Sequence, residues 1–197
     1  MIKKRIFAYI IDMIIITIIS SFIYVLPVFE KEQEYYLEAT NNYTETYKEY
    51  RENKKTENDV LNAEYEMVIT SSTLLIIRIS TIIIYFSIIP YFKNGQTFGK
   101  KIIKIQVVPN KGKNINPGLF FLRGLLSSNV IVEIISILIL IFASKTIYQN
   151  TSLLISYVTY FIYFLMIYIP LSRKDNKTLH DLITKTKVVE LKTIDNK

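Results

Sequence analysis

The chain has 197 residues, a net charge of +7 and no cysteine, and half of its residues are hydrophobic. The lack of cysteine excludes a disulfide-stapled scaffold and a thiolate metal site. The hydrophobic residues are concentrated in long blocks, and the 27 residues of 146–172 carry no charge. Because a run of more than about 18 such residues is long enough to cross a bilayer, a soluble monomer is excluded.

Four apolar blocks each approach the roughly 20 residues that a membrane-spanning helix needs. In lipid the backbone must satisfy its own hydrogen bonds, which favours helices over open strands. The first block is too long for a signal peptide and lacks a small-residue cleavage site, so we expect it to remain uncleaved. We therefore expect residues 1–197 to form one all-α integral membrane domain with four transmembrane helices. They cover about 6–29, 68–92, 119–142 and 151–171.

The charges between these blocks predict the orientation of the chain. Residues 30–67 hold 11 acidic and 5 basic residues, whereas residues 93–118 hold six lysines and no acidic residue. The tail, residues 172–197, holds 7 basic and 4 acidic residues. Because basic loops stay in the cytoplasm, we expect both termini and the lysine-rich loop inside and the acidic segment outside.

The acidic segment 30–67 allows two interpretations. Tyr36, Tyr43, Tyr47 and Tyr50 are spaced to share one face of a helix. The favoured interpretation is a helical extension of the first two spans, with the tyrosines packed between its arms. The alternative is a docking face for an extracellular partner, because aromatic clusters favour interfaces. The length of the segment, well beyond that of a plain hairpin connection, supports the alternative.

Four ionisable residues fall within the predicted spans, where they are costly and are functional candidates: Asp12, Arg78, Arg123 and Glu133. At a rise of 1.5 Å per residue, Asp12 and Arg123 lie roughly 9 and 6 Å from the cytoplasmic side. Arg78 and Glu133 lie roughly 21 Å from it, beyond the midplane. We therefore expect two ion pairs, Asp12 with Arg123 and Arg78 with Glu133. Arg5 lies on the same helix face as Asp12 and can join the inner pair.

These pairs have a structural and a functional interpretation. Paired charges can fix helix order and register, or a carboxylate can load and release a proton or cation. The structural interpretation is slightly favoured for Arg78 with Glu133. For Asp12 with Arg5 and Arg123 the structural and the functional interpretation are equally supported.

The regions outside the spans predict a small cytoplasmic β element. Residues 101–108 are expected to form a strand, residues 109–112 a turn and residues 113–116 a return, and the β-branched run 186–191 is expected to pair with them. The nearby glycines, at 95 and 99, have three residues between them instead of four, and Lys101 replaces the required Ser or Thr, which argues against a nucleotide-binding loop. The lysines are interpreted as topology determinants that contact anionic lipid rather than nucleic acid.

No motif predicts catalysis. The spacing of His, Asp and Glu fits no metal site, and no nucleophile has a base beside it. The single histidine, His180, is interpreted as a surface or supporting group. We expect no enzyme activity, no metal and no cofactor.

Several short patterns resemble the RDD family of bacterial membrane proteins, which is named for an arginine and two aspartates. The first helix opens with Arg5-x-x-Ala8-x-x-x-Asp12, and Arg123 stands where the family has an arginine entering the next helix. One departure is Lys185, where family tails carry a glycine before Thr186. The other matching residues are Gly95, Thr97, Gly99 and Lys100 in the central loop, and Leu179-His180-Asp181 followed by Thr186-Lys187-Val188-Val189 in the tail.

The resemblance implies that Arg5, Asp12 and Asp181 are the name-giving residues and that the chain lies in a bacterial cytoplasmic membrane. Some members are thought to exchange sodium for protons, which implies transport. We expect a small homo-oligomeric carrier that moves a cation against protons, with Asp12 and Glu133 as loading sites. The alternative is an accessory or immunity-type membrane protein that acts through residues 30–67.

Overall fold

The computed structural model describes residues 1–110 and 116–191. Within them, three helical segments are long and apolar enough to cross a membrane: α1 (Ile2–Tyr24), Ser72–Phe92 and α9 (Lys145–Ser172). A fourth span is present if α7 (Pro117–Ser128) and α8 (Val130–Phe142), which meet at an angle of 73°, count as one. The expected helical multi-pass architecture is thus confirmed, with three spans or four.

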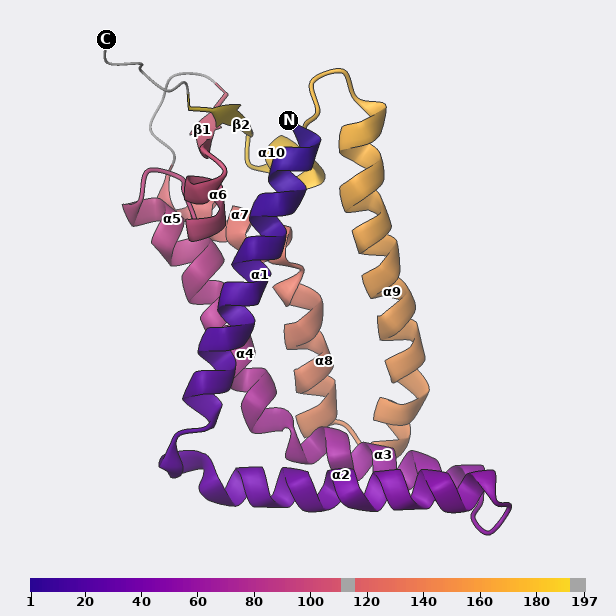
Figure 1. Cartoon of the computed structure of the whole chain (residues 1–197). Helices are drawn as coiled ribbons and strands as arrows, with labels where there is room; N and C mark the ends of the chain where they lie inside the picture. Colours follow the sequence, from indigo (N-terminus) through magenta and orange to yellow (C-terminus); the bar gives the residue numbers. More distant parts are fainter. Residues whose placement is uncertain (111–115, 192–197) are drawn as a thin grey trace.

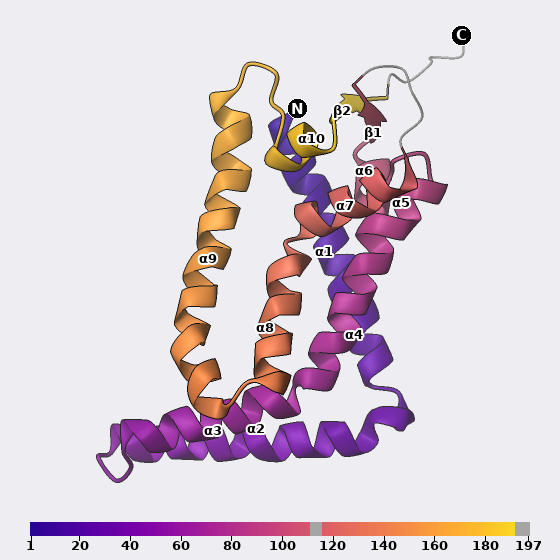
Figure 2. The same ribbon diagram turned by 180° about the vertical axis from the view of Figure 1, so that it is seen from behind.

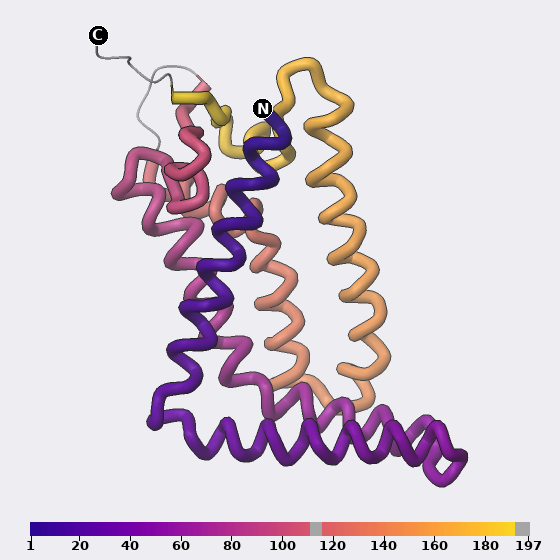
Figure 3. The backbone as a smooth tube through the Cα atoms, in the orientation of Figure 1, coloured from indigo at the N-terminus to yellow at the C-terminus, as the bar shows by residue number. Residues whose placement is uncertain are grey.

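The spanning helices stand side by side, and the two ends of the bundle differ (Figures 1 and 2). One end, here called the sheet end, carries the start of α1, the two-stranded sheet and several short helices. The other, the hairpin end, is crossed by the helical hairpin within residues 30–70, which runs across the ends of the spans, as the backbone trace also shows (Figure 3). The remaining elements are η1 (Pro27–Phe29), α2 (Glu30–Arg51), α3 (Glu57–Thr70), α4 (Ser72–Ile83), η2 (Ile84–Ile88), α5 (Ile89–Phe92), α6 (Phe98–Ile102), β1 (Ile105–Pro109), α10 (Leu179–Ile183) and β2 (Thr186–Glu190).

The hairpin end departs from the favoured interpretation of residues 30–67. Residues 30–51 and 57–67 are helical, but α1 ends at Tyr24 and the chain turns through the short helix that begins with Pro27, so α2 lies across the bundle instead of continuing α1. Helices α2 and α3 pair with each other, and Thr56 caps α3 through a reciprocal bond with Asp59. Tyr47 contacts the rings of its neighbouring tyrosines on α2 yet stays exposed. The tyrosines are therefore only partly packed between the arms.

The second span contains a π-helical turn, η2, just before Pro90. Pro90 has no amide to donate to the carbonyl four residues earlier, which loosens the helix at this point. The turn buries Tyr85, Phe86 and Ser87 in the bundle. Helix α7 packs tightly against this π-helical turn. A side chain at Gly124 would clash with Ser87 Oγ and reach within 2.7 Å of the Phe86 carbonyl oxygen, so only glycine fits there.

The third apolar block, residues 119–142, is expected to form one transmembrane helix, and in the structure this stretch is broken into two helices that meet at 73°. Asn129 adopts the left-handed conformation, with φ 59° and ψ 14°, and separates α7 from α8. Asparagine takes this conformation more readily than other residues with a side chain. As a result α7 and its Arg123 stay at the sheet end, while Glu133 lies in the first turn of α8.

The small sheet is present, with different bounds from those predicted. Strands β1 and β2 are antiparallel, and Val107 faces Val188 in the register. The first strand begins at Ile105 because residues 98–102 form α6. Residues 111–115, which include most of the predicted return strand at 113–116, lie outside the described part of the chain. The sheet packs against α1 and α7 through a second core, made of Ala8, Ile105, Val107, Phe120 and Val188.

The main core joins α1, the second span and α8, and α9 contributes little to it. Its buried members are Ile16, Ile79, Ile82, Tyr85, Phe86, Val130 and Ile137. In α9 the only residue that is buried is Pro170. Since buried apolar contacts hold helices in place, α9 is the least firmly packed of the spanning helices.

Candidate functional site

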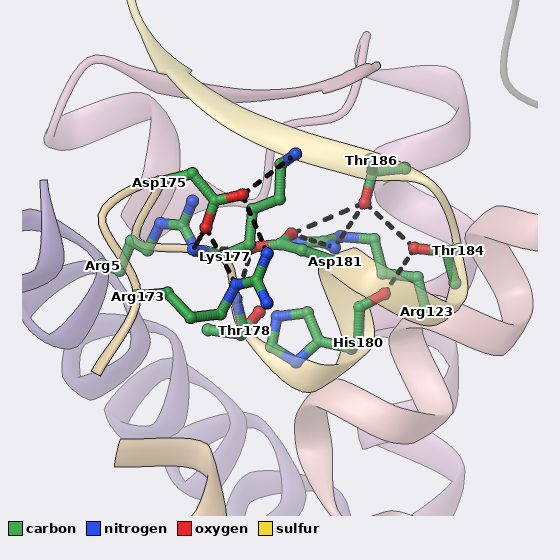
Figure 4. A network of polar contacts seen from close by, with 10 residues as sticks. All are labelled: Arg5, Arg123, Arg173, Asp175, Lys177, Thr178, His180, Asp181, Thr184 and Thr186. Atoms are coloured by element: carbon green, nitrogen blue, oxygen red, sulfur yellow. Dashed lines mark hydrogen bonds and ion pairs between the residues drawn. The ribbon is translucent and has the colours of Figure 1, made fainter. Parts of the chain in front are cut away.

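The sheet end is held together by a buried carboxylate between two arginines. Asp181, in the first turn of α10, is fully buried. Arg5 Nη1 of α1 donates to its Oδ2 atom at 2.6 Å, and Arg123 Nη1 of α7 donates to its Oδ1 atom at 2.6 Å (Figure 4). The backbone amide of Thr178 donates to Oδ2 at 3.1 Å. One carboxylate thus joins three helices that are far apart in the sequence.

Hydroxyl groups extend this network to the second strand. Arg123 Nη1 also donates to Thr186 Oγ1 at 2.7 Å, and the hydroxyls of Thr186 and Thr184 lie 2.9 Å apart. Lys185, between them, adopts a left-handed conformation with φ 51°. Glycine takes this conformation at lower cost, which explains why the family pattern has glycine there. The turn that places β2 therefore forms here despite the lysine.

The expected pairing of Asp12 with Arg123 is wrong. The bend at Asn129 keeps Arg123 next to α10, where it forms an ion pair with Asp181. Asp12 is buried against α6 instead, and its partners are uncharged. It accepts hydrogen bonds from Tyr85 Oη at 2.7 Å, Thr97 Oγ1 at 2.6 Å and the Gly99 amide at 2.6 Å.

The pattern Gly95-x-Thr97-x-Gly99 therefore serves the packing of α6 on α1. A side chain at Gly99 would clash with the carbonyl oxygen of Ala8, so the two backbones approach as closely as glycine permits. Gly95 has φ +79°, and a side chain there would clash with the carbonyl oxygen of Val107. Thr97 caps α6 and donates to Asp12. The hydrogen-bond donors of this loop thus bind the carboxylate of Asp12, which belongs to the same chain.

The Arg78–Glu133 pair is present between α4 and α8. Arg78 Nη2 donates to Glu133 Oε1 at 2.6 Å. Both side chains line a cavity of about 190 Å³, here called the hairpin-end cavity. Tyr148, Ile155 and Thr159 of α9 complete the wall that faces them.

A second cavity of about 270 Å³, the sheet-end cavity, lies beside the Asp181 network. Tyr163, Met166, Ile167 and Pro170 of α9 form one wall. Its charged and polar lining includes Arg5, Asp12, Lys100, Arg123, Thr178 and His180. The part played here by Lys100 and Tyr163 has no clear signal in the sequence, because it depends on how α6 and α9 are placed.

Burial shapes the charges around the sheet-end cavity. Burial, followed by the nearby Arg123, lowers the pKa of Lys100 to about 8. The same two causes hold the pKa of His180 well below its usual value, so that it is neutral at pH 7. Burial raises the pKa of Asp181, but Arg123, His180 and Arg5 outweigh it and keep this carboxyl ionised. In residues 1–110 and 116–191, no group of His, Asp and Glu is arranged to hold a metal ion.

Comparison with known proteins agrees with the resemblance in the sequence. The family model described as the RDD family matches residues 1–185. This range includes Arg5, Asp12, Asp181 and the central-loop residues of the resemblance, and it ends just before Thr186. Searches of the curated proteins and of the solved structures give no match.

Removing the central carboxylate should destabilise the protein. In Asp181→Asn, Arg5 and Arg123 are left buried without a counter-charge, a change that costs about 3–5 kcal/mol when a buried pair is broken. We expect a large fall in the thermal unfolding midpoint in detergent. Asp175→Asn is the matched control, because Asp175 pairs with Arg173 at 2.9 Å on the surface. Similar midpoints for the two variants would contradict the central role of Asp181.

Replacing Lys100 should stabilise the protein in a pH-dependent way. The unfolded chain binds more protons than the folded one between about pH 8 and 10.5, so the stability of the wild type rises over this window. We expect Lys100→Met to raise the unfolding midpoint at pH 7 and this gain to shrink as the pH approaches 10.5. Lys101→Met, at an exposed neighbour, is the control. A rise in the unfolding midpoint that is independent of pH would refute the lowered pKa of Lys100 as its cause.

Proposed function

This chain belongs to the RDD family, and we propose that it is a secondary carrier that exchanges a cation for protons through the carboxylate of Glu133. The observation that carries this proposal is the pair of cavities in series along α9. Thr159 lines the hairpin-end cavity and Tyr163 lines the sheet-end cavity, only one helical turn further on. A carrier needs a site near mid-membrane that opens to one side at a time.

The packing of α9 supports its role as the moving element. Its only buried residue is Pro170, near one end of the helix. A shift of α9 relative to α1 and α8 therefore breaks few buried contacts, whereas the other spans share the main core. Four helices are few to enclose a pathway, so we propose that the carrier works as a homo-oligomer.

Of the two carboxylates expected to load the cargo, Glu133 suits the role better. Asp12 is fully buried and its oxygens are occupied by three donors. Glu133 keeps 24% of its side chain exposed and lines a cavity. Its bond to Arg78 uses Oε1, and Oε2 accepts no hydrogen bond from the described residues. We therefore assign loading to Glu133 and a structural role to Asp12.

Transport in proteoliposomes tests this assignment. We expect sodium or potassium to dissipate a pH gradient across vesicles that hold the wild-type protein. Glu133→Gln removes the titrating group and should abolish this exchange. Glu66→Gln, at an exposed carboxylate of α3, should leave it unchanged. The proposal fails if no cation moves protons, or if Glu133→Gln transports like the wild type.

We also propose that the sheet end faces the cytoplasm of a bacterium and the hairpin end faces outward. Residues 93–110, the described part of the lysine-rich loop before α7, lie at the sheet end, and the acidic segment, residues 30–67, forms the hairpin end. Basic loops are retained in the cytoplasm, which supports this orientation.

A second candidate function is docking of a partner protein on the hairpin formed by α2 and α3. Tyr35 and Leu37 of α2 are each 61% exposed, and exposed aromatic and apolar side chains favour interfaces. An accessory or immunity-type role would use this face and would require it to lie outside the cell.

Labelling of introduced cysteines tests the orientation and the docking function together. The chain has no cysteine, so single sites are unambiguous. Asn53 at the hairpin end and Asn94 at the sheet end are both exposed and both have positive φ, which makes them a matched pair. In intact cells a membrane-impermeant maleimide should label Asn53→Cys and spare Asn94→Cys. The reverse pattern would contradict both proposals.

A further inference from the structure

The sheet-end cavity combines charged and apolar walls. Arg5, Lys100, Arg123 and His180 line its polar side. The rest of its wall is mainly apolar and comes from several elements: Ile2, Ile6, Phe86, Ile105, Ile167 and Val188. Such a combination suits a ligand with a charged head and an apolar body.

The charges of this cavity do not balance. Arg5 and Arg123 share the single carboxylate of Asp181. The other carboxylate, Asp12, accepts only from uncharged donors. No carboxylate of the described residues lies within 4.0 Å of the Lys100 ammonium. Three cationic side chains therefore face two anionic ones, and the cavity has room for one more negative charge.

Three buried polar atoms of residues that line the cavity also lack partners. Arg5 Nε, a donor, Thr178 Oγ1 and His180 Nδ1 form no hydrogen bond in the described part of the chain. Buried polar atoms of this kind are nearly always bonded in folded proteins. An unmatched donor next to unmatched positive charge indicates a ligand that brings anionic oxygen atoms.

The cavity also reaches the lipid-facing surface of the bundle. Ile6 of α1 and Ile167 of α9 line it and are nevertheless 46% and 57% exposed. Both helices are long and apolar enough to span the membrane. A ligand that enters between them meets apolar side chains first and the charged groups behind them.

We propose that the sheet-end cavity binds the phosphate of an anionic phospholipid, with Arg5 and Lys100 as its ligands. The acyl chains leave the cavity between α1 and α9, past Ile6 and Ile167. Burial and the charge of Arg123 lower the pKa of Lys100. This is consistent with a site whose positive charge an anion would neutralise. The site is separate from Glu133 and does not depend on transport.

Lipid binding to the full-length protein in detergent tests the proposal. Phosphatidylglycerol should bind and raise the unfolding midpoint, whereas zwitterionic phosphatidylcholine and inorganic phosphate alone should not. Lys100→Met should weaken phosphatidylglycerol binding by about fivefold or more, and the exposed Lys101→Met should bind like the wild type. Lys100→Met removes a partly buried charge that forms no ion pair within the described residues, so loss of folding is not expected to mask the result.

A second variant tests the path of the acyl chains. Ile167→Trp fills the mouth between α1 and α9 without changing any charge, and it should also weaken phosphatidylglycerol binding. Glu133→Gln should bind the lipid normally, which separates this site from transport. Equal binding of both phospholipids, binding of inorganic phosphate alone, or normal lipid binding by Lys100→Met would overturn the proposal.

Discussion

The arrangement of the sheet end depends on one interaction, the buried carboxylate of Asp181 between Arg5 and Arg123. Each guanidinium lies where an unpaired charge is costly, so α1, α7 and α10 cannot separate without exposing or stranding a charge. The strand that follows α10 is tied to the same network through Thr186. The tail is thereby fixed on the bundle, although it is remote in sequence from α1.

The second name-giving aspartate, Asp12, has a different physical role. It is held by neutral donors, among them the amide of Gly99. This places the first turn of α6 against α1, where a side chain at Gly99 would not fit. Both aspartates thus fasten short elements to the bundle, and neither is free to carry cargo. In this chain the residues of the family pattern assemble the sheet end, which supports Glu133 as the loading carboxylate of the proposed carrier.

The sequence predicts the spans and the Arg78–Glu133 pair from depth along a helix at a constant rise per residue. The pair forms although each count crosses an irregularity, the turn η2 for Arg78 and the bend at Asn129 for Glu133. The same arithmetic fails for Arg123, because the left-handed Asn129 bends the chain by 73°. A hydropathy pattern does not reveal the backbone conformation of one residue. The polar run Ser127-Ser128-Asn129 inside an apolar block was the available signal. The cavities depend on the loose placement of α9, on which composition carries no information.

The charges of the two cavities constrain how transport and lipid binding relate. In the hairpin-end cavity the Arg78–Glu133 pair carries no net charge, so a cation that the proposed carrier loads there meets less repulsion than at the sheet end. At the sheet end the same cation meets three basic side chains against two carboxylates that are already occupied. A phosphate bound at Lys100 would cancel this excess. The proposed exchange of a cation through the sheet end would therefore require the proposed anionic site to be filled, or a path along α9 that avoids it.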